Sequence, residues 1–173
     1  MAKVSQRQIL AYITPKNTTV LGTSEKPETP PSFGGPGEST FKFAQVSGGE
    51  ITASVEKIYE GGAKRPTVLC APAEIGDITL TAHYDDSAAA TGVATALRKL
   101  RQFVGVGFYD ITIQTYNWGL TSSSNDRVYS NALLVGLTEP DGDSSSGAPT
   151  TFALTFSVSD VNPPSTPTTT TAA

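Results

Sequence analysis

Segments that alternate between apolar and polar residues restrict the fold of this chain more than any other feature. The clearest fall within residues 48–84, where one alternating segment covers 51–59 and a second covers 77–84. Successive side chains of a strand point to opposite faces, so a period of two predicts strands with one buried and one solvent-facing side. Their connection carries no catalytic constellation. The residues expected on the buried faces are Ile51, Ala53, Val55, Tyr59, Ile78, Leu80, Ala82 and Tyr84.

Further alternating segments occur at 109–118, 128–137 and 150–159, and a short one containing Phe41 and Phe43 begins at Thr40. Their polar positions are rich in threonine, a β-branched residue that favours strands. We predict about six strands, packed as an antiparallel sandwich or barrel because each hides one face. The apolar residues expected in phase are Tyr109, Ile111, Ile113, Tyr129, Leu133, Val135, Leu137, Phe152, Leu154, Phe156 and Val158.

Residues 87–104 depart from this alternation and predict one long helix. Ser87 is a suitable N-cap, and Gly105 or Gly107 would end the helix. Basic residues near the C-terminal end complement the helix dipole. Such a helix would cover an open edge or one end of the sheet. Its apolar stripe is Val93, Ala96, Leu97, Leu100, Phe103 and Val104, and its basic residues are Arg98, Lys99 and Arg101.

The two ends of the chain and the segment 14–39 differ from the rest in residue pattern and composition. Residues 5–13 have the capping-box spacing of a short helix, with a strand as the competing interpretation. Prolines and glycines make a central strand or helix in 14–39 unfavourable, so it is either a floppy loop or an arm that orders against a neighbouring subunit. We expect a single domain over 1–160 and a disordered, low-complexity Pro/Thr tail over 161–173.

Composition limits the classes of function. The chain has 173 residues and a net charge of −4, which fits one domain and argues against a surface that grips nucleic acid. It does not exclude a surface past which nucleic acid moves. The single cysteine rules out a disulfide framework within the chain. No signal peptide or membrane span is recognisable, so we expect folding in a cytoplasm.

Reactive side chains are few. His83, with Asp85 and Asp86, could hold one cation, but a strand end leading into a helix N-terminus explains the same residues better. No nucleophile elbow accompanies the serines, so catalysis is not expected. Cys70 has apolar neighbours and is expected to be buried and inert. We therefore expect no enzyme, no metal site and no cofactor.

Two further motifs have structural interpretations. GGAKRP, residues 61–66, lacks the GKS or GKT of a phosphate-binding loop, and its glycines suit positive φ in an exposed hairpin. Tyr116 and Trp118 could form a platform for stacking a sugar, although one tryptophan at a strand end is more often a packing residue.

The strand ending in VEKIYEGG, the loop AKRPTV, the strand GDITLTAHYD, the amphipathic helix and the strand YDITIQ together resemble the tail tube (major tail) proteins of tailed bacteriophages. The resemblance covers about residues 40–118 and rests on signatures of fold. Phe103 stands where contractile-tail relatives have a tryptophan, which favours a long flexible tail. The residues that match the family's pattern are Glu56, Gly61, Gly62, Gly76, Ile78, Thr79 and Leu80.

The resemblance implies a sandwich or barrel whose sheets join those of its neighbours in a sixfold ring. Rings would stack into a hollow tube that conducts viral DNA from capsid to host during ejection. The implied partners are further copies of the chain, other tail proteins such as the tape measure and tail terminator, and DNA that passes without specific binding. No membrane is implied. The protein would be made in the bacterial cytoplasm and act in the virion.

In that setting, polar strand faces are candidates for the lumen, because hydroxyls and carboxylates offer no cations to hold phosphates. The loop 60–67 and the arm 14–39 are candidates for contacts between rings or subunits. The lumen candidates are Thr52, Ser54, Glu56, Asp77, Thr79, Thr81, Asp110, Thr112 and Gln114. The contact candidates are Pro27, Pro30, Pro31, Gly61, Gly62, Lys64 and Arg65.

Three alternatives remain open from the residues. The Pro/Thr tail is similar to linkers of secreted carbohydrate-active proteins, so a secreted-type β-sandwich binding module, directed at carbohydrate, is the main rival. A tail-completion or secretion-tube protein of the same fold is the second. A hydrolase built around His83 is the last.

Overall fold

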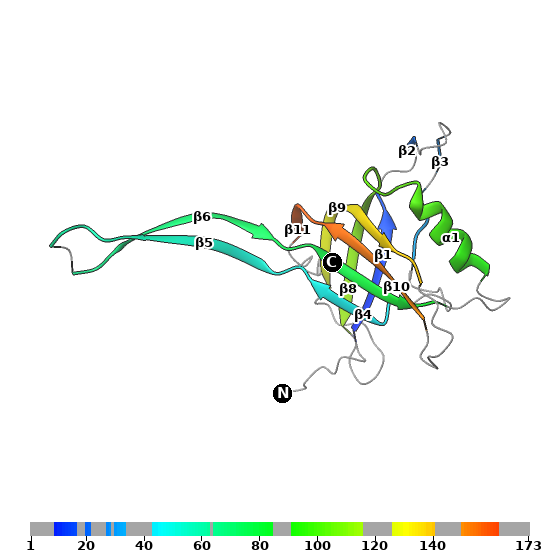
Figure 1. Ribbon diagram of the computed structural model, residues 1–173, viewed down its shortest axis with the longest axis horizontal. Coiled ribbons are helices and arrows are strands. Elements are labelled where there is room, and N and C mark those ends of the chain that lie inside the picture. The colour runs from blue at the N-terminus through cyan, green and yellow to red at the C-terminus, as the bar shows by residue number, and fades with distance from the viewer. Residues whose placement is uncertain are drawn as a thin grey trace, which may run out of the picture.

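A curled, seven-stranded antiparallel sheet forms the body of the subunit (Figure 1). The computed structural model describes residues 9–16, 20–21, 27–28, 30–33, 43–62, 64–84, 91–115, 126–140 and 150–162. The order of the strands is β1-β8-β9-β10-β7-β4, and β11 pairs with β9. The strands are β1 (Ile9–Pro15), β4 (Gln45–Gly48), β7 (Ile78–His83), β8 (Phe108–Thr115), β9 (Arg127–Thr138), β10 (Thr151–Ser157) and β11 (Asp160–Asn162).

Alternation places one apolar face of this sheet in the core, which confirms the mainly β fold. Every second residue of β7, β8 and β10 is buried, and α1 (Thr91–Arg101) packs its apolar side against the same cluster. Tyr109 and Phe156 meet edge to face, with ring centroids 5.7 Å apart. The largest fully buried side chains are Tyr109, Phe33, Phe103, Phe152, Phe156, Ile13, Ile78, Leu80, Leu100, Ile111, Leu134 and Leu154.

The helix is shorter than its sequence pattern predicts. It begins at Thr91 and ends at Arg101, after which turns lead to Gly105 at φ 83°. Positive φ suits glycine, so Gly105 closes this region as expected. Val93, Leu97, Leu100 and Phe103 are buried as predicted, but Val104 is exposed because it follows the last helical turn. Ser87 lies outside the described residues.

The phase predicted for β9 is partly wrong. Tyr129 is buried, but Leu133 is half-buried and Val135 is exposed, while Ala132 and Leu134 face the core. The pairing shifts against β8 between Tyr109 and Ile111, and against β10 between Thr155 and Phe156. Each shift is a bulge that gives one strand an extra residue and reverses the faces that follow.

The N-terminal segment forms a strand and not a helix. Residues 9–15 are β1, which pairs with residues 109–115 of β8, so the competing interpretation of this stretch was right and the helix was wrong. Pairing with a buried neighbour outweighs a capping-box spacing. The part of residues 5–13 before Ile9 lies outside the described residues.

Part of the Pro/Gly-rich segment folds back onto the body. A two-stranded ladder joins β2 (Val20–Leu21) to β3 (Pro27–Glu28). Phe33 is buried, and its backbone exchanges two hydrogen bonds with Ile13, at 2.9 and 3.0 Å. Pro30 is also buried. Residues 30–33 therefore belong to the body, because Phe33 fills the core beside β1.

The first two residues of the predicted tail, Val161 and Asn162, belong to a strand. Residues 160–162 form β11, which pairs with Val128, Tyr129 and Ser130 of β9. Val161 packs against the core, which explains why these residues are ordered as a strand. Residues 163–173 lie outside the described residues.

A long hairpin projects from the body (Figure 1). It consists of β5 (Ile51–Ile58) and β6 (Thr67–Ile75), which pair with each other and with no strand of the body. Within the described residues no helix combines the length and apolar character needed to span a membrane.

Candidate assembly interface

Glycines shape the root of the hairpin. Gly48 and Gly49 have φ of 89° and 73°, and a Cβ at Gly48 would lie 1.9 Å from the carbonyl oxygen of Asp77. Two backbone hydrogen bonds close the root: Gly76 N–H donates to Glu50 O at 2.8 Å, and Gly49 N–H donates to Asp77 O at 3.3 Å. Only glycine fits such a backbone without strain. The chain can therefore leave the sheet between β4 and β7 and form a separate ladder.

The register sorts the hairpin's side chains onto two unlike faces. Ile51 pairs with Ile75, Ala53 with Ala73, and Val55 with Cys70. A bulge of one extra residue in β6, at Ala71–Pro72, preserves this matching. Side chains of paired residues lie on the same face of a ladder. The apolar face of the hairpin is Ile51, Ala53, Val55, Val68, Cys70, Ala73 and Ile75, interrupted by Lys57. Tyr59, directly after β5, continues the same alternation in the sequence.

The opposite, polar face of the hairpin carries Thr52, Ser54, Glu56, Thr67 and Glu74, together with Ile58 and Leu69.

Both faces of the hairpin are open to solvent in the single subunit. Tyr59 is 75% exposed, Ile51 63% and Val55 53%, so the prediction that this strand buries its apolar side is wrong. Cys70 is exposed as well, contrary to expectation. An isolated two-stranded hairpin has no core of its own, and contiguous exposed apolar surface marks an interaction site. The apolar face is therefore the strongest candidate interface.

The main sheet has a polar face opposite its core. Cross-strand pairing sets Ser47, Thr79 and Thr155 in one row and Gln45, Thr81 and Ala153 in the next. On β8, Thr112 and Gln114 alternate with the buried Ile111 and Ile113 and so lie on this same face.

The structure divides the predicted lumen residues between three places. Five of them, on β7 and β8, share the polar face of the body: Thr79, Thr81, Asp110, Thr112 and Gln114. Thr52, Ser54 and Glu56 belong to the hairpin instead, because β5 does not join the main sheet. Asp77 lies in the turn between β6 and β7.

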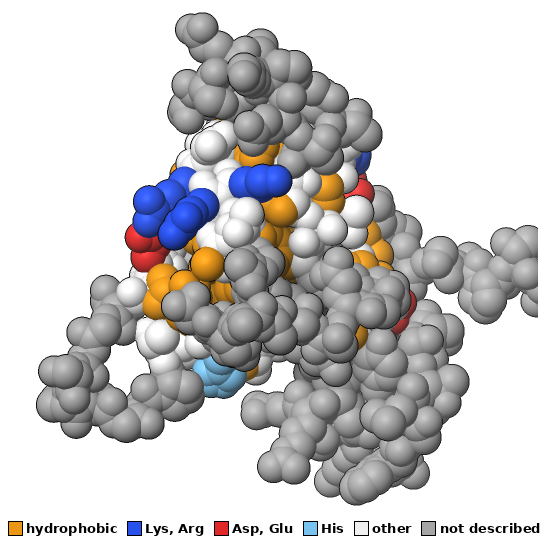
Figure 2. All heavy atoms as spheres, turned by 90° about the vertical axis from the view of Figure 1, so that its right-hand side faces the viewer, with side chains coloured by type: hydrophobic (Ala, Val, Ile, Leu, Met, Phe, Trp, Pro, Cys, Tyr) orange, Lys and Arg blue, Asp and Glu red, His pale blue; other side chains and the backbone are white. Residues whose placement is uncertain are grey.

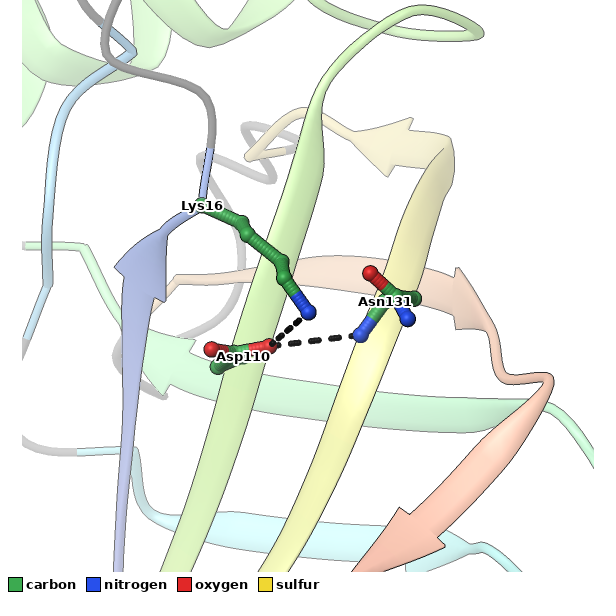
Figure 3. Close-up of polar contacts among 3 residues, drawn as sticks. All are labelled: Lys16, Asp110 and Asn131. Carbon is green, nitrogen blue, oxygen red and sulfur yellow. Dashed lines mark hydrogen bonds and ion pairs between the residues drawn. The ribbon is translucent and has the colours of Figure 1, made fainter.

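Figure 3 shows how Asp110 organises part of this polar face. Asn131 at the bulge of β9 has φ 55°, and its backbone N–H donates to Asp110 Oδ1 at 3.2 Å. Lys16 Nζ lies 3.9 Å from the same oxygen. One carboxylate therefore satisfies the irregular backbone of β9 and neutralises the nearest lysine. Gln114 Nε2 similarly donates to Asp126 Oδ2 at 2.9 Å.

The two outer strands of the sheet offer further contacts. β4 pairs only with β7, and β1 pairs with β8 and, at Ile13, with Phe33. Within the described part of the chain, the outer side of β4 has no strand partner. Such an edge is a template for pairing with another chain.

The helix side of the body is basic (Figure 2). A cavity of about 410 Å³ opens there, lined by Tyr84, Ala94, Leu97, Arg98, Arg101, Glu139, Pro140 and Thr150. Arg101 forms an ion pair with Glu139.

His83 is exposed, and the described residues contain no group of three His, Cys, Asp or Glu side chains fit to hold a metal. Asp85, Asp86, Tyr116 and Trp118 lie outside the described residues.

The predicted contact residues have different surroundings. Gly61, Gly62, Lys64 and Arg65 are exposed at the tip of the hairpin, and Gly62 has the expected positive φ, 88°. Pro27 lies in β3, Pro31 is half-buried and Pro30 is buried in the body. Sequence reasoning missed the apolar face of the hairpin, although its alternation was visible, because the same pattern normally indicates a strand buried within its own subunit.

Comparison with solved structures identifies the fold. No protein-family model and no curated protein matches the sequence. Cryo-EM structures of the anti-feeding prophage tube-terminating cap and of a sheath/tube terminator from the extracellular contractile injection system PVC contain chains similar to this one. For the cap the TM-score is 0.64 at 16% identity, covering 94% of this chain and 91% of that chain. For the terminator it is 0.62 at 19% identity, covering 94% and 96%.

A chain of the sixfold-symmetrised anti-feeding prophage baseplate also matches, with TM-score 0.60 at 18% identity over 94% of this chain and 95% of that one. The subunit therefore shares the fold of chains in these prophage and injection-system assemblies, in agreement with the resemblance seen in the sequence. The terminator comes from a contractile injection system, whereas the sequence favoured a flexible tail. A shared fold does not decide the type of tail.

Proposed function

We propose that this protein is a structural subunit that polymerises, through stacked sixfold rings, into a hollow tail tube. Two observations support the proposal. The fold is that of chains in tail-like particles, one of them solved with sixfold symmetry. The hairpin exposes an apolar face that no described part of the single subunit covers. The second observation carries the proposal, because it identifies a surface that must find a partner.

The partner of the apolar face is another copy of the chain. Covering each large apolar side chain contributes on the order of 1 kcal/mol or more. Head-to-tail contacts of this kind generate rings where the rotation closes and filaments where it does not. The outer side of β4 could add a backbone contact with β1 of a neighbour, joining the sheets into one wall.

The polar face of the body is then the wall of the channel. Thr79, Thr81 and Thr112 offer hydroxyls, and the carboxylate of Asp110 already neutralises Lys16. Such a surface repels phosphates weakly and presents few cations to retain them. Viral DNA would pass along it during ejection without specific binding. Tape measure and terminator proteins would be the other partners, within a virion assembled in the bacterial cytoplasm.

The central test compares two adjacent residues on opposite faces of the hairpin. Val55→Asp places a charge on the apolar face, and Ser54→Asp places the same charge on the polar face. We expect tubes from wild type and Ser54→Asp, but only dispersed, folded subunits from Val55→Asp, in negative-stain images and by sedimentation. Tubes of normal length from Val55→Asp would exclude the apolar face as the assembly surface.

Cys70 supplies an independent measurement on the unmodified protein. It lies on the apolar face beside Val55 and is exposed in the free subunit. A maleimide reagent should label it rapidly in dilute protein and at least about tenfold more slowly in sedimented tubes, because the covered face excludes reagent. Equal labelling in both states would place the hairpin outside the contact.

A terminator ring is the second candidate. The cap and the sheath/tube terminator match as well as any other structure described above. A terminator would form rings that do not stack, so images of concentrated protein distinguish the two: tubes for the proposed subunit, isolated rings for a terminator.

A further inference from the structure

Charge is distributed unevenly along the hairpin. Glu50, Glu74 and Asp77 gather at the root, where Gly76 is hydrogen-bonded to Glu50 and Gly49 to Asp77. Lys64 and Arg65 stand at the tip, together with one carboxylate, Glu60. All six side chains are exposed, and no ion pair involving them occurs among the described residues. The root therefore carries three negative charges, whereas the tip has a net positive charge.

The subunit cannot pair these two ends by itself. Gly61 follows Glu50 by eleven positions, which places the tip about 36 Å from the root at about 3.3 Å per residue. Charges this far apart are screened from each other at physiological salt, where the Debye length is about 8 Å. Only a second molecule can bring a basic tip to an acidic root.

We propose that the hairpin tip of one subunit docks on the hairpin root of the next copy along the tube, with Lys64 and Arg65 facing Glu50, Glu74 and Asp77. The inference deepens the proposed function and rests on it. The apolar face supplies most of the affinity. Exposed ion pairs contribute little energy, but complementary charges fix which partner and which register are accepted.

The contact between tip and root is directional, and it predicts the axial repeat of the tube. Tip and root are different surfaces, so the contact is heterologous and repeats in an open series. Equivalent points on successive copies are then separated by the length of the hairpin. The axial repeat of the tube should be about 36 Å if the hairpin lies along the axis, and shorter if it is tilted.

Charge reversal in two complementary variants provides the test. One carries a reversed tip, Lys64→Glu with Arg65→Glu, and the other a reversed root, Glu50→Lys with Glu74→Lys. In each, the tip and the root have the same sign, so the concentration needed for assembly should rise at least about tenfold. In an equimolar mixture every contact between unlike variants is again complementary. The mixture should therefore form tubes in which the two alternate along the axis.

The control is Arg98→Glu with Lys99→Glu, which makes the same change of charge as the reversed tip. These residues lie on α1, on the other side of the body from the hairpin (Figure 1). This variant should assemble like wild type. Circular dichroism and the melting temperature establish that all variants fold, and sedimentation with negative-stain imaging reports tubes.

The outcomes separate the two proposals. Absence of tubes from wild type overturns the proposed function itself. If wild type assembles and either charge-reversed variant assembles equally well alone, the tip-to-root contact is wrong while the tube remains. Failure of the mixture to assemble also rejects it, because the charges would then act elsewhere. Rescue only in the mixture establishes the contact.

Discussion

Leu80, Leu154 and Phe156 are wholly buried in the body, whereas Ile51, Val55 and Tyr59 in the hairpin remain largely open to solvent. Five of these residues belong to strands with the same alternation of apolar and polar residues, and Tyr59 directly follows β5. In the body, the apolar side faces α1 and the other strands of the sheet. In the hairpin, it faces none of the other helices and strands that the structure describes. The comparison teaches that alternation specifies a face to be covered, but not the molecule that covers it.

The largest difference should appear when matched apolar residues are shortened. Leu154→Ala removes a fully buried side chain and should lower the free energy of unfolding of the isolated subunit by about 2 to 5 kcal/mol. Val55→Ala should change it by less than about 0.5 kcal/mol, because no core contact is lost. Urea denaturation of dilute subunit measures both, and a large effect of Val55→Ala would show that the hairpin packs on its own body.

The junction between the two regions should be the next most sensitive. Gly48→Ala forces a Cβ towards the carbonyl oxygen of Asp77 at a residue with φ 89°. We expect a loss of about 1 to 3 kcal/mol in the free energy of unfolding. Gly61→Ala is the matched control, because a Cβ there meets nothing within 4 Å. It should leave the free energy of unfolding unchanged in the same denaturation experiment.

A smaller effect is expected within the body at Tyr109. Its hydroxyl is buried and has no hydrogen-bond partner among the residues that the structure describes, and burial raises the pKa of its phenol above the ordinary value. Tyr109→Phe should therefore leave the free energy of unfolding unchanged or raise it by up to about 1 kcal/mol at pH 7.

The same variant has a distinct response to alkaline pH. The pKa of Tyr109 is higher in the folded protein than in the unfolded chain, where it is about 10. The unfolded chain therefore ionises first, so the free energy of unfolding of wild type is unaffected by this group below about pH 10 and falls as the pH rises further. Wild type should lose stability above pH 10 more steeply than Tyr109→Phe. Equal slopes would mean that Tyr109 ionises as freely in the folded protein as in the unfolded chain.

Much of the body could be predicted from its sequence, because β7, β8 and β10 alternate without interruption and the helical stripe at Val93, Leu97 and Leu100 is clear. The buried face of β9 could not be predicted, because two bulges interrupt its alternation. The residues that face the core follow no single period: Tyr129, Ala132, Leu134 and the partly buried Leu137. Nothing in the local sequence of Ser130 and Asn131 marks a bulge; Asp110, from another strand, stabilises it.

The candidate interface was predictable only in outline. The glycines and cations of the hairpin tip are visible in the sequence, and they lie where an exposed loop was expected. The root glycines detach β5 from the main sheet. For this reason Thr52 and Ser54 lie on the hairpin, away from Thr79 and Thr81 on the body. Pairing between distant strands decides this, and no short stretch of residues encodes it.

The bulges of β9 have a geometric consequence. This strand pairs with β8 through residues 127–133 and with β10 through residues 133–138, so it joins the two halves of the sheet. Bulges bend and twist the strand that contains them. The arc contributed by each subunit, and with it the bore of any closed cylinder, is therefore set largely at Asn131 and Val135. In the proposed tube, changing those two positions should alter the radius of the ring more than the contacts between neighbouring subunits.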